Sequence, residues 1–497
     1  MIFDRLLPLL VLGTSLVTGL VIFMLGETRV RTRTVLNLAG ATLKLALVGV
    51  MIWGVFHQHV YETRWSFLPG LDFVLRADAM TILFSSLSAL LWLLTTIYAI
   101  GYLEHAPNRR RFFGYFSFCV TATMGVSLAG NLLTFFVFYE MLTLTTYPLV
   151  AHRGTEASLR AAGIYLRYTL LGSAAILLGM AWLYRLAGAF DFTETGAVGF
   201  LDQAHHAELI IIFALLVGGF GVKAGLVPFH RWLPEAMVAP APVSALLHAV
   251  AVVKAGAFGI VRVVYDVYGV QFAATLGVLP VLAGAAAFTI VFGSVRALFQ
   301  DDLKRRLAYS TVSQVSYIAL GVSILGPAAT IGGLVHLAHQ GLMKITMFFC
   351  AGNLAETLGV HKISELKGAG RRMPWTMAAF TLAALGMIGV PPLAGFISKW
   401  YLGAGAVAAG DYWVLGVLAV SSLLNAAYFL PIIHAAWFMP QTGPWPHEHE
   451  EHGRFETTLW LLAPPLVTAL LVILTGLFAA SDYSPLAWVK IIAGREY

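Results

Sequence analysis

Apolar runs of about twenty residues follow one another along almost the whole of this 497-residue chain. A helix needs roughly 20 apolar residues, at about 1.5 Å each, to cross a bilayer core about 30 Å thick. We count fourteen such runs, beginning near residues 6, 35, 78, 112, 131, 161, 209, 242, 272, 307, 328, 375, 412 and 457. They lack the period-two alternation of membrane barrel strands, so helices are the remaining solution. The sequence therefore predicts an all-α polytopic membrane protein with about 14 transmembrane helices.

Composition agrees with this fold class and limits the chemistry of the chain. Hydrophobic residues make up 59% of the chain and charged residues 11%, with a mean hydropathy of +0.80. The first run is too long for a signal-peptide core and has no small-residue cleavage site, so we expect a helix there. Both cysteines, Cys119 and Cys350, lie in apolar runs, which excludes a disulfide framework and a cysteine-ligated cluster. The largest loops have about twenty residues, so the function resides in the membrane or at its surface.

Basic residues gather in alternate loops. The loops after odd-numbered helices contain Arg29, Arg31, Arg33, Arg109, Arg110, Arg111, Arg153, Arg160, Arg231, Lys304, Arg305, Arg306, Lys362, Lys367, Arg371, Arg372 and Arg454. The even loops and both termini contain only Arg5, Arg64, Arg76, Arg185, Arg262, Lys490 and Arg495. The positive-inside rule then predicts cytoplasmic odd loops, with both termini on the non-cytoplasmic side of the cell (inner) membrane. These basic clusters are short and scattered, which argues against a nucleic-acid partner.

Ionisable residues inside the runs point to function, because each costs at least about 2.5–3.5 kcal/mol at the bilayer centre. They are Lys44 in the second helix, Glu140 in the fifth, Arg167 in the sixth, Lys223 in the seventh, His248 and Lys254 in the eighth, His336, His339 and Lys344 in the eleventh, and Lys399 at the twelfth. A lysine near a helix end can snorkel to the surface, and Lys44, Lys254 or Lys399 alone would fit that explanation. Five lysines at membrane depth call for more than that.

Glu140 and Lys223 are opposite in sign and about ten residues inside their runs, too deep for snorkelling. Glu140 is the single acid in FFVFYEMLTLTTYPLV (135–150). Pairing favours the ionised form of each group, so we expect an ion pair that either fixes two helices or switches. Lysine, unlike arginine, can release its proton when it is desolvated, and histidine titrates near neutrality. The lysine and histidine row therefore predicts a proton relay.

Two of the runs are interrupted close to these lysines. Lys223 lies five residues before Pro228, and Pro391 and Pro392 precede Lys399 by seven or eight residues. Broken membrane helices occur where the freed carbonyls face protein or water, so these segments should line an interior cavity. Because the seventh and twelfth helices are five apart, we expect two inverted five-helix repeats, helices 4–8 and 9–13. The predicted units are residues 1–111, 112–265, 266–440 and 441–497, the last being a loop and a C-terminal helix.

Three segments resemble a known family. They are RADAMTILFSSLSALLWLLTTIYAIGYL (76–103), KAGLVPFHRWLPEAMVAPAPVSALLHAVAVVKAGAFGIVR (223–262) and QDDLKRRLAYSTVSQVSYIALG (300–321). They are similar to the antiporter-like subunits of respiratory complex I, of membrane-bound hydrogenases and of Mrp-type multisubunit cation/proton antiporters. The resemblance covers residues from about 76 to 440. The length and the FYEM context of Glu140 favour the D-type subunit of the Mrp antiporters.

The resemblance implies a role for each site residue. Glu140 and Lys223 would form the switching ion pair, Lys254 would be the relay lysine and Lys399 the terminal proton site. His248, His336 and Lys344 would line the channel. Where relatives often place a second histidine, this chain has Gln340 with His339 beside it, which leaves the link between the half-channels less defined. The implied partners are other membrane subunits and protons, with no cofactor and no metal in this chain. Whether the ion exchanged for the proton is Na⁺, K⁺ or none stays open from the sequence.

Three alternatives stay open from the sequence. The chain could be the proton-pumping subunit of a redox-driven complex such as an NADH dehydrogenase or a membrane-bound hydrogenase, although it has no redox motif of its own. It could be a membrane cytochrome with His248 and His336 as haem ligands, which the lysines at membrane depth argue against. A structural scaffold would leave those lysines unexplained. The run HEHEEH (447–452) fits a metal-binding loop or, more simply, a solvated polar loop.

Overall fold

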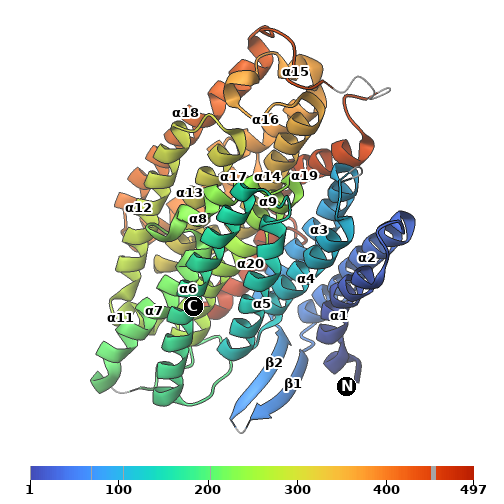
Figure 1. Ribbon diagram of the computed structural model, residues 1–497. Helices are drawn as coiled ribbons and strands as arrows, with labels where there is room; N and C mark the ends of the chain where they lie inside the picture. The colour runs from blue at the N-terminus through green and yellow to red at the C-terminus, as the bar shows by residue number, and fades with distance from the viewer. Residues whose placement is uncertain (1, 69, 104–105, 202, 449–454) are drawn as a thin grey trace.

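The computed structural model describes residues 2–68, 70–103, 106–201, 203–448 and 455–497, and it is a bundle of helices (Figure 1). The long helices are α1 (Ile2–Met24), α2 (Val30–Phe56), α3 (Ala79–Tyr102), α4 (Arg109–Leu128), α5 (Leu132–Val150), α6 (Glu156–Ala187), α7 (His206–Ala224), α9 (Ala241–Ala249), α10 (Val252–Arg262), α12 (Val278–Leu298), α13 (Leu303–Ser323), α14 (Pro327–Leu358), α16 (Pro374–Ile388), α17 (Ala394–Ala409), α18 (Trp413–Phe438), α19 (Leu459–Leu477) and α20 (Pro485–Glu496). Short helices are α8 (Trp232–Glu235), α11 (Val270–Thr275) and α15 (Ala369–Arg372). A helix begins within a few residues of each expected run, which confirms the helical membrane fold.

Among the described residues, ten helical stretches are long and apolar enough to cross a membrane by length and composition. The other expected runs form α4, α13, α14 and the pair α16 and α17. The first two begin with basic clusters, and α14 carries histidines, a glutamine and a lysine in its apolar stretch. The helices α16 and α17 are only 15 and 16 residues long because the chain breaks between them. The number of fourteen spans therefore stays a prediction.

A two-stranded antiparallel sheet, β1 (Tyr61–Leu68) and β2 (Leu71–Ala77), lies at the same end of the bundle as the N-terminus (Figure 1). The sequence led us to expect only a loop here. Arg64 donates to Asp72 at 2.8 Å and also pairs with Asp191, which follows α6. Arg76 bonds Glu62 at 2.8 Å and Asp191 at 3.0 Å. Ion pairs thus tie the hairpin to the α6–α7 connection.

Three basic residues that we expected in loops are instead buried in helices: Arg33, Arg262 and Arg306. Arg262 shows why the prediction was wrong. Its guanidinium is 2.8 Å from Asp78 and 3.0 Å from Asp266, so carboxylates compensate its charge inside the fold. The helix therefore continues past Arg262 into a π-helix, Val263–Tyr268. The sidedness of the termini accordingly stays a prediction.

Both expected helix breaks are present. The helix α7 ends at Gly225, whose φ of 77° is the left-handed conformation that glycine adopts without strain, and α16 ends the same way at Gly389, with a φ of 99°. A third break, which has neither proline nor glycine, separates α9 from α10 at Val250 and Ala251. The breaks fit the expected pattern of repeats, while the boundaries of the four predicted units stay a prediction.

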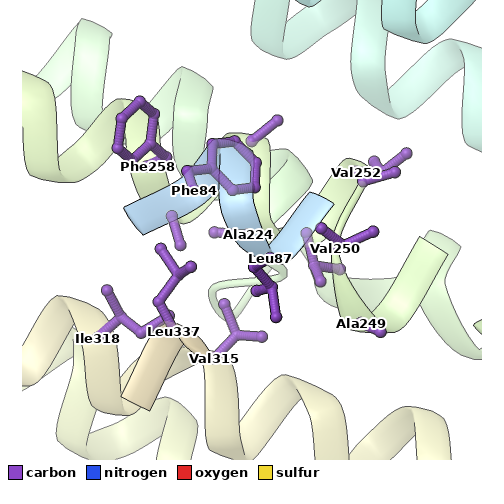
Figure 2. Packing of buried hydrophobic residues seen from close by; sticks show 14 of the residues in the cluster. Phe84, Leu87, Ala224, Ala249, Val250, Val252, Phe258, Val315, Ile318 and Leu337 are labelled. Carbon is purple, nitrogen blue, oxygen red and sulfur yellow. The ribbon is translucent and has the colours of Figure 1, made fainter. Parts of the chain in front are cut away.

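The buried core surrounds this third break. Figure 2 shows Leu87 of α3 close to Val250 and Phe84 of α3 beside Phe258, with Val315, Ile318 and Leu337 from α13 and α14 near Leu87. All of these side chains are at least nine-tenths buried. The apolar packing joins the two halves of the bundle and encloses the polar side chains described next.

Candidate functional site: a lysine row inside the bundle

Glu140 and Lys223 face each other from α5 and α7 without joining. The half-buried carboxylate of Glu140 accepts a hydrogen bond from the hydroxyl of Ser173 on α6. The fully buried Nζ of Lys223 donates to the carbonyl of Tyr139 at 2.5 Å and lies 3.3 Å from the centroid of the Tyr139 ring. In the part of the chain that the structure describes, the two side chains form no ion pair, although the charge of Glu140 acts on Lys223. The expected ion pair is therefore not formed in this arrangement, and its switching role stays a prediction.

The break in α7 places Lys223 in the last turn of the helix. Beyond Gly225 the chain resumes at a short 3₁₀ turn, Phe229–Arg231, followed by α8. The carbonyls freed by a break must find donors, and the indole of Trp232 donates to the carbonyl of Val222 at 2.7 Å. The hydrogen bond from Trp232 therefore stabilises the C-terminal end of α7, and Lys223 remains in the last turn of that helix.

His248 and Lys254 lie on either side of the third break. His248 is in the last turn of α9, its ring 4.6 Å from that of Phe348, and Lys254 is in the first turn of α10. Both side chains are fully buried. Neither ring nitrogen of His248 nor the Nζ of Lys254 has a hydrogen-bond partner among the described residues. Buried polar atoms of this kind are normally satisfied by water, so the break is a natural place for a hydrated channel.

The helix α14 contributes two histidines and a lysine, all fully buried. The Nδ1 atoms of His336 and His339 lie 3.0 and 3.4 Å from the hydroxyl of Ser398 in α17. Lys344 donates to the hydroxyl of Ser310 at 2.7 Å and to the carbonyl of Leu307 at 3.2 Å, both in α13. The residues of α14 are therefore bridged to the neighbouring helices by neutral hydroxyls and carbonyls.

Lys399 occupies the second broken helix. From α17 its Nζ reaches back to the end of α16, where it donates to the carbonyls of Met387 at 3.1 Å and Ile388 at 2.8 Å. A third bond goes to the hydroxyl of Ser422 at 2.9 Å. A helix C-terminus carries partial negative charge, so this position favours a cation and also supplies acceptors for a neutral amine.

Lys254 lies in the middle of the row. Its helix α10 packs against α7 and α13, and α14, which carries His336 and Lys344, packs against α13 and against α17, which carries Lys399. Lys223 is joined to this row by packing, because a Cβ at Gly256, two residues after Lys254, would collide with the backbone of Ala224. The structure therefore brings all the predicted site residues into one interior region that runs from the first broken helix to the second.

Comparison with known proteins agrees with this arrangement. Residues 129–425 match the family profile described as "NADH:quinone oxidoreductase/Mrp antiporter, TM", and residues 69–113 match "NADH-Ubiquinone oxidoreductase (complex I), chain 5 N-terminus". The first match spans more than half of the chain. The chain belongs to this antiporter-like family.

Relatives of this antiporter-like chain include subunits of NADH-quinone oxidoreductases and subunits of cation/proton antiporters. It is 37% identical over 405 residues to an N-type subunit of NADH-quinone oxidoreductase from Desulforudis audaxviator, covering 79% of each chain. It is 28% identical over 448 residues to a D-type subunit of the Na⁺/H⁺ antiporter from Bacillus subtilis, covering 89% of this chain and 88% of the relative. A chain of the Mrp complex from Dietzia sp. has the same fold, with a TM-score of 0.86 at 22% identity over 100% of this chain and 98% of that one.

Sequence reasoning missed the neutral partners of the site in this antiporter-like chain. Ser173, Ser310 and Ser398 were not singled out, because a serine in a membrane helix is more often a packing residue or bonds its own backbone. Ser398 directly precedes Lys399, and this adjacency is the one sequence feature that pointed to it. The third break was missed because it has neither proline nor glycine.

In the part of the chain that the structure describes, no group of three or more His, Cys, Asp or Glu residues could hold a metal ion. The HEHEEH run lies largely outside the described residues. The rings of His248 and His336, the haem ligands of the alternative hypothesis, lie against the rings of Phe348 and Tyr317 in tilted arrangements, with centroids 4.6 and 5.1 Å apart.

Proposed function

We propose that this chain is a proton-translocating subunit of a multisubunit membrane complex, acting in cation/proton antiport of the Mrp type with Na⁺ as the exchanged ion. Protons pass between Lys223, Lys254 and Lys399, while the histidines and Lys344 carry the connecting hydrogen bonds. The relatives named for antiport and for NADH-quinone oxidoreduction support a subunit role, since both are described as subunits. We place the chain in the cell membrane with both termini on the non-cytoplasmic side.

The observation that carries this proposal is the separation of Glu140 from Lys223. Lys223 rests on the carbonyl of Tyr139, which accepts a hydrogen bond from either an ammonium or an amine. When Glu140 leaves Ser173 and approaches, the carboxylate favours the ammonium form of Lys223. When Glu140 returns to Ser173, desolvation favours the amine, and the proton moves on to Lys254. A carboxylate with two partners thus converts a small rotation into proton transfer.

The test is transport by the native complex in proteoliposomes, read as Na⁺-driven collapse of an imposed pH gradient with a pH-sensitive dye. We expect Glu140→Ala and Lys223→Ala to abolish transport while the complex stays assembled, because each removes one partner of the switch. Glu140→Asp should retain part of the activity, since it keeps the charge and loses only reach. Lys490→Ala at an exposed position is the control. Normal transport by both alanine variants would refute the relay.

A redox-driven pump is the second candidate, favoured by the 37% identity to an NADH-quinone oxidoreductase subunit. The same lysine row would then be driven by partner subunits. Mass spectrometry of the gently solubilised complex, with an optical and metal scan of the same sample, separates the two. Only small membrane partners without flavin, iron or nickel would support the antiporter. Redox subunits in the complex would support the pump.

A further inference from the structure

Lys44 is a buried lysine that the proposed relay does not use. It lies in α2, outside both predicted repeats, and its side chain is 0% exposed. Its Nζ donates to the hydroxyl of Ser15 in α1 at 2.5 Å and lies 4.9 Å from the ring centroid of Trp92 in α3. Among the residues that the structure describes, no carboxylate forms an ion pair with it. An ammonium with one hydroxyl partner and one aromatic face is expensive to bury permanently.

The helices α1 to α4 enclose this lysine, since α1 packs against α2 and α4, and α3 packs against the same two helices. A chain of hydrogen bonds runs from the Nζ of Lys44 through Ser15 to Thr121. The hydroxyl of Thr121 in α4 donates to the carbonyl of Ser117 at 3.0 Å, so it can accept from Ser15, 2.8 Å away. Ser15 in turn accepts from Lys44. Either protonation state of the lysine can donate into this chain.

Polar atoms without a protein partner connect Lys44 with one end of the four helices. In the described part of the chain the buried atoms of this kind on α2, α3 and α4 include Arg33 Nη2, Asn37 Oδ1, Trp92 Nε1, Thr96 Oγ1 and Ser117 Oγ. Arg33, Asn37 and Lys44 recur on one face of α2, and Thr96 lies one turn from Trp92 on α3. Arg33 marks the outer end, where it is 3.7 Å from the half-exposed Glu27. Buried polar atoms in such a row are satisfied by water.

We infer that Lys44 is an additional proton-binding site of the transport cycle, supplied through a file of water that begins at Arg33 and passes Asn37. The lone pair of the Lys44 amine takes a proton from a hydronium ion that arrives along the file, forming the ammonium and leaving a neutral water, and the adjacent water accepts the proton again on release. This site goes beyond the proposed relay, whose residues lie on α5, α7, α9, α10, α14 and α17.

Other titratable groups on the packed elements are engaged elsewhere. Tyr98 of α3 donates to the carbonyl of Phe349 at 3.0 Å, and Cys119 of α4 is 3.6 Å from the hydroxyl of Thr146 in α5. The remaining ones lie toward the helix ends: Asp4, Arg5, Glu27, Arg29, Arg31, Tyr61, Tyr102, Arg109, Arg110, Arg111 and Tyr115. Lys44 is therefore the buried group of this four-helix unit whose surroundings suit proton exchange.

Transport by the complex in proteoliposomes tests the inference. Lys44→Met removes the site, and Lys44→Arg keeps a cation that does not release its proton. We expect both to lower the transport rate at least tenfold, with Lys490→Met unchanged as the control. Normal transport by Lys44→Met, in a preparation where Lys223→Ala is inactive, would overturn the Lys44 site and leave the proposed function intact. Full activity of Lys44→Arg would mean that only a fixed charge is needed, which also overturns it.

A second measurement uses the unmodified complex and so does not depend on the variants folding. In X-ray hydroxyl-radical footprinting, oxidation requires water beside the side chain. Trp92 and Trp232 are both 0% exposed, but Trp232 donates its indole N–H to Val222 whereas Trp92 has no partner among the described residues. We expect oxidation of Trp92 and protection of Trp232. Equal protection of both would overturn the water file.

Discussion

Ser173→Ala is the most direct probe of the Glu140 switch. The hydroxyl of Ser173 donates to the carboxylate of Glu140 in the separated arrangement, and Lys223 is then bound to the carbonyl of Tyr139. Removing the hydroxyl takes away the partner that holds Glu140 apart from Lys223. The paired arrangement loses nothing, because it does not use Ser173. The substitution should therefore shift the equilibrium toward the ion pair.

The size of the shift follows from the type of hydrogen bond. A hydrogen bond to a charged group contributes about 1.5–3 kcal/mol, and each 1.4 kcal/mol changes an equilibrium about tenfold. Glu140 is half-buried, so water compensates part of the loss and the lower value applies. If separation of the pair limits the cycle, Ser173→Ala should slow transport about tenfold, to a rate still well above that of Glu140→Ala.

Initial rates of pH-gradient collapse in proteoliposomes, normalised to assembled complex, measure this effect. Thr169→Val is the matched control, because Thr169 lies one turn earlier on α6. Among the described residues its buried hydroxyl bonds only its own helix, at 2.9 Å from the carbonyl of Tyr165 and 3.2 Å from that of Leu166. Ser173→Thr keeps the hydroxyl and should retain most of the rate. An unchanged or faster rate in Ser173→Ala would refute the role of Ser173 in the switch.

Three further outcomes are expected. Gly256→Ala should lower the thermal midpoint of the complex, at a cost of about 1–3 kcal/mol for overpacking, because its Cβ would collide with the backbone of α7. Gly284→Ala, with nothing within 4 Å of the new Cβ, is the control, and equal midpoints would contradict the packing argument. Burial and two neighbouring arginines lower the pKa of His152 from 6.5 to about 4. The unfolded chain then binds the proton first, so stability should fall as the pH drops from 6.5 toward 4, and His152→Phe should weaken that dependence in a thermal-shift series. Lys399→Arg keeps a cation at the end of α16 but does not release a proton, so the complex should assemble and fail to transport. Wild-type transport would show that Lys399 only caps the helix.

The helical membrane fold could be predicted from the sequence because bilayer thickness sets the length of each apolar run. The breaks beside Lys223 and Lys399 were equally visible, since proline and glycine mark them. The hairpin was not predicted, although Tyr61 and Thr63 are buried on one side of β1 and the polar residues alternate with them. That period-two pattern lies between two strong helical runs and is only a few residues long.

The charges were predicted less well than the helices. Hydropathy places a helix end where charge appears, so Arg262 was assigned to a loop, and only the three-dimensional structure shows the carboxylates of Asp78 and Asp266 beside it. The residues of the candidate site could be predicted from the sequence, because burying a charge at membrane depth costs free energy wherever it occurs. Their hydrogen-bond partners could not be predicted, because a serine or a backbone carbonyl in a helix can be buried without that cost.

The partners of the buried lysines suggest why lysine was retained at these depths. Lys223, Lys344 and Lys399 all donate to neutral backbone carbonyls, and the latter two also donate to hydroxyls, as does Lys44. These acceptors bind an N–H of either an ammonium or an amine. Lys223 donates one such bond and Lys344 two, so each can lose a proton and keep its bonds, whereas Lys399 donates three and gives up one of them when it becomes an amine. A carboxylate at each lysine would instead hold every proton in place. Glu140 lies near Lys223 and can move between two partners, Ser173 and Lys223. A relay requires such a movable carboxylate to release protons in sequence.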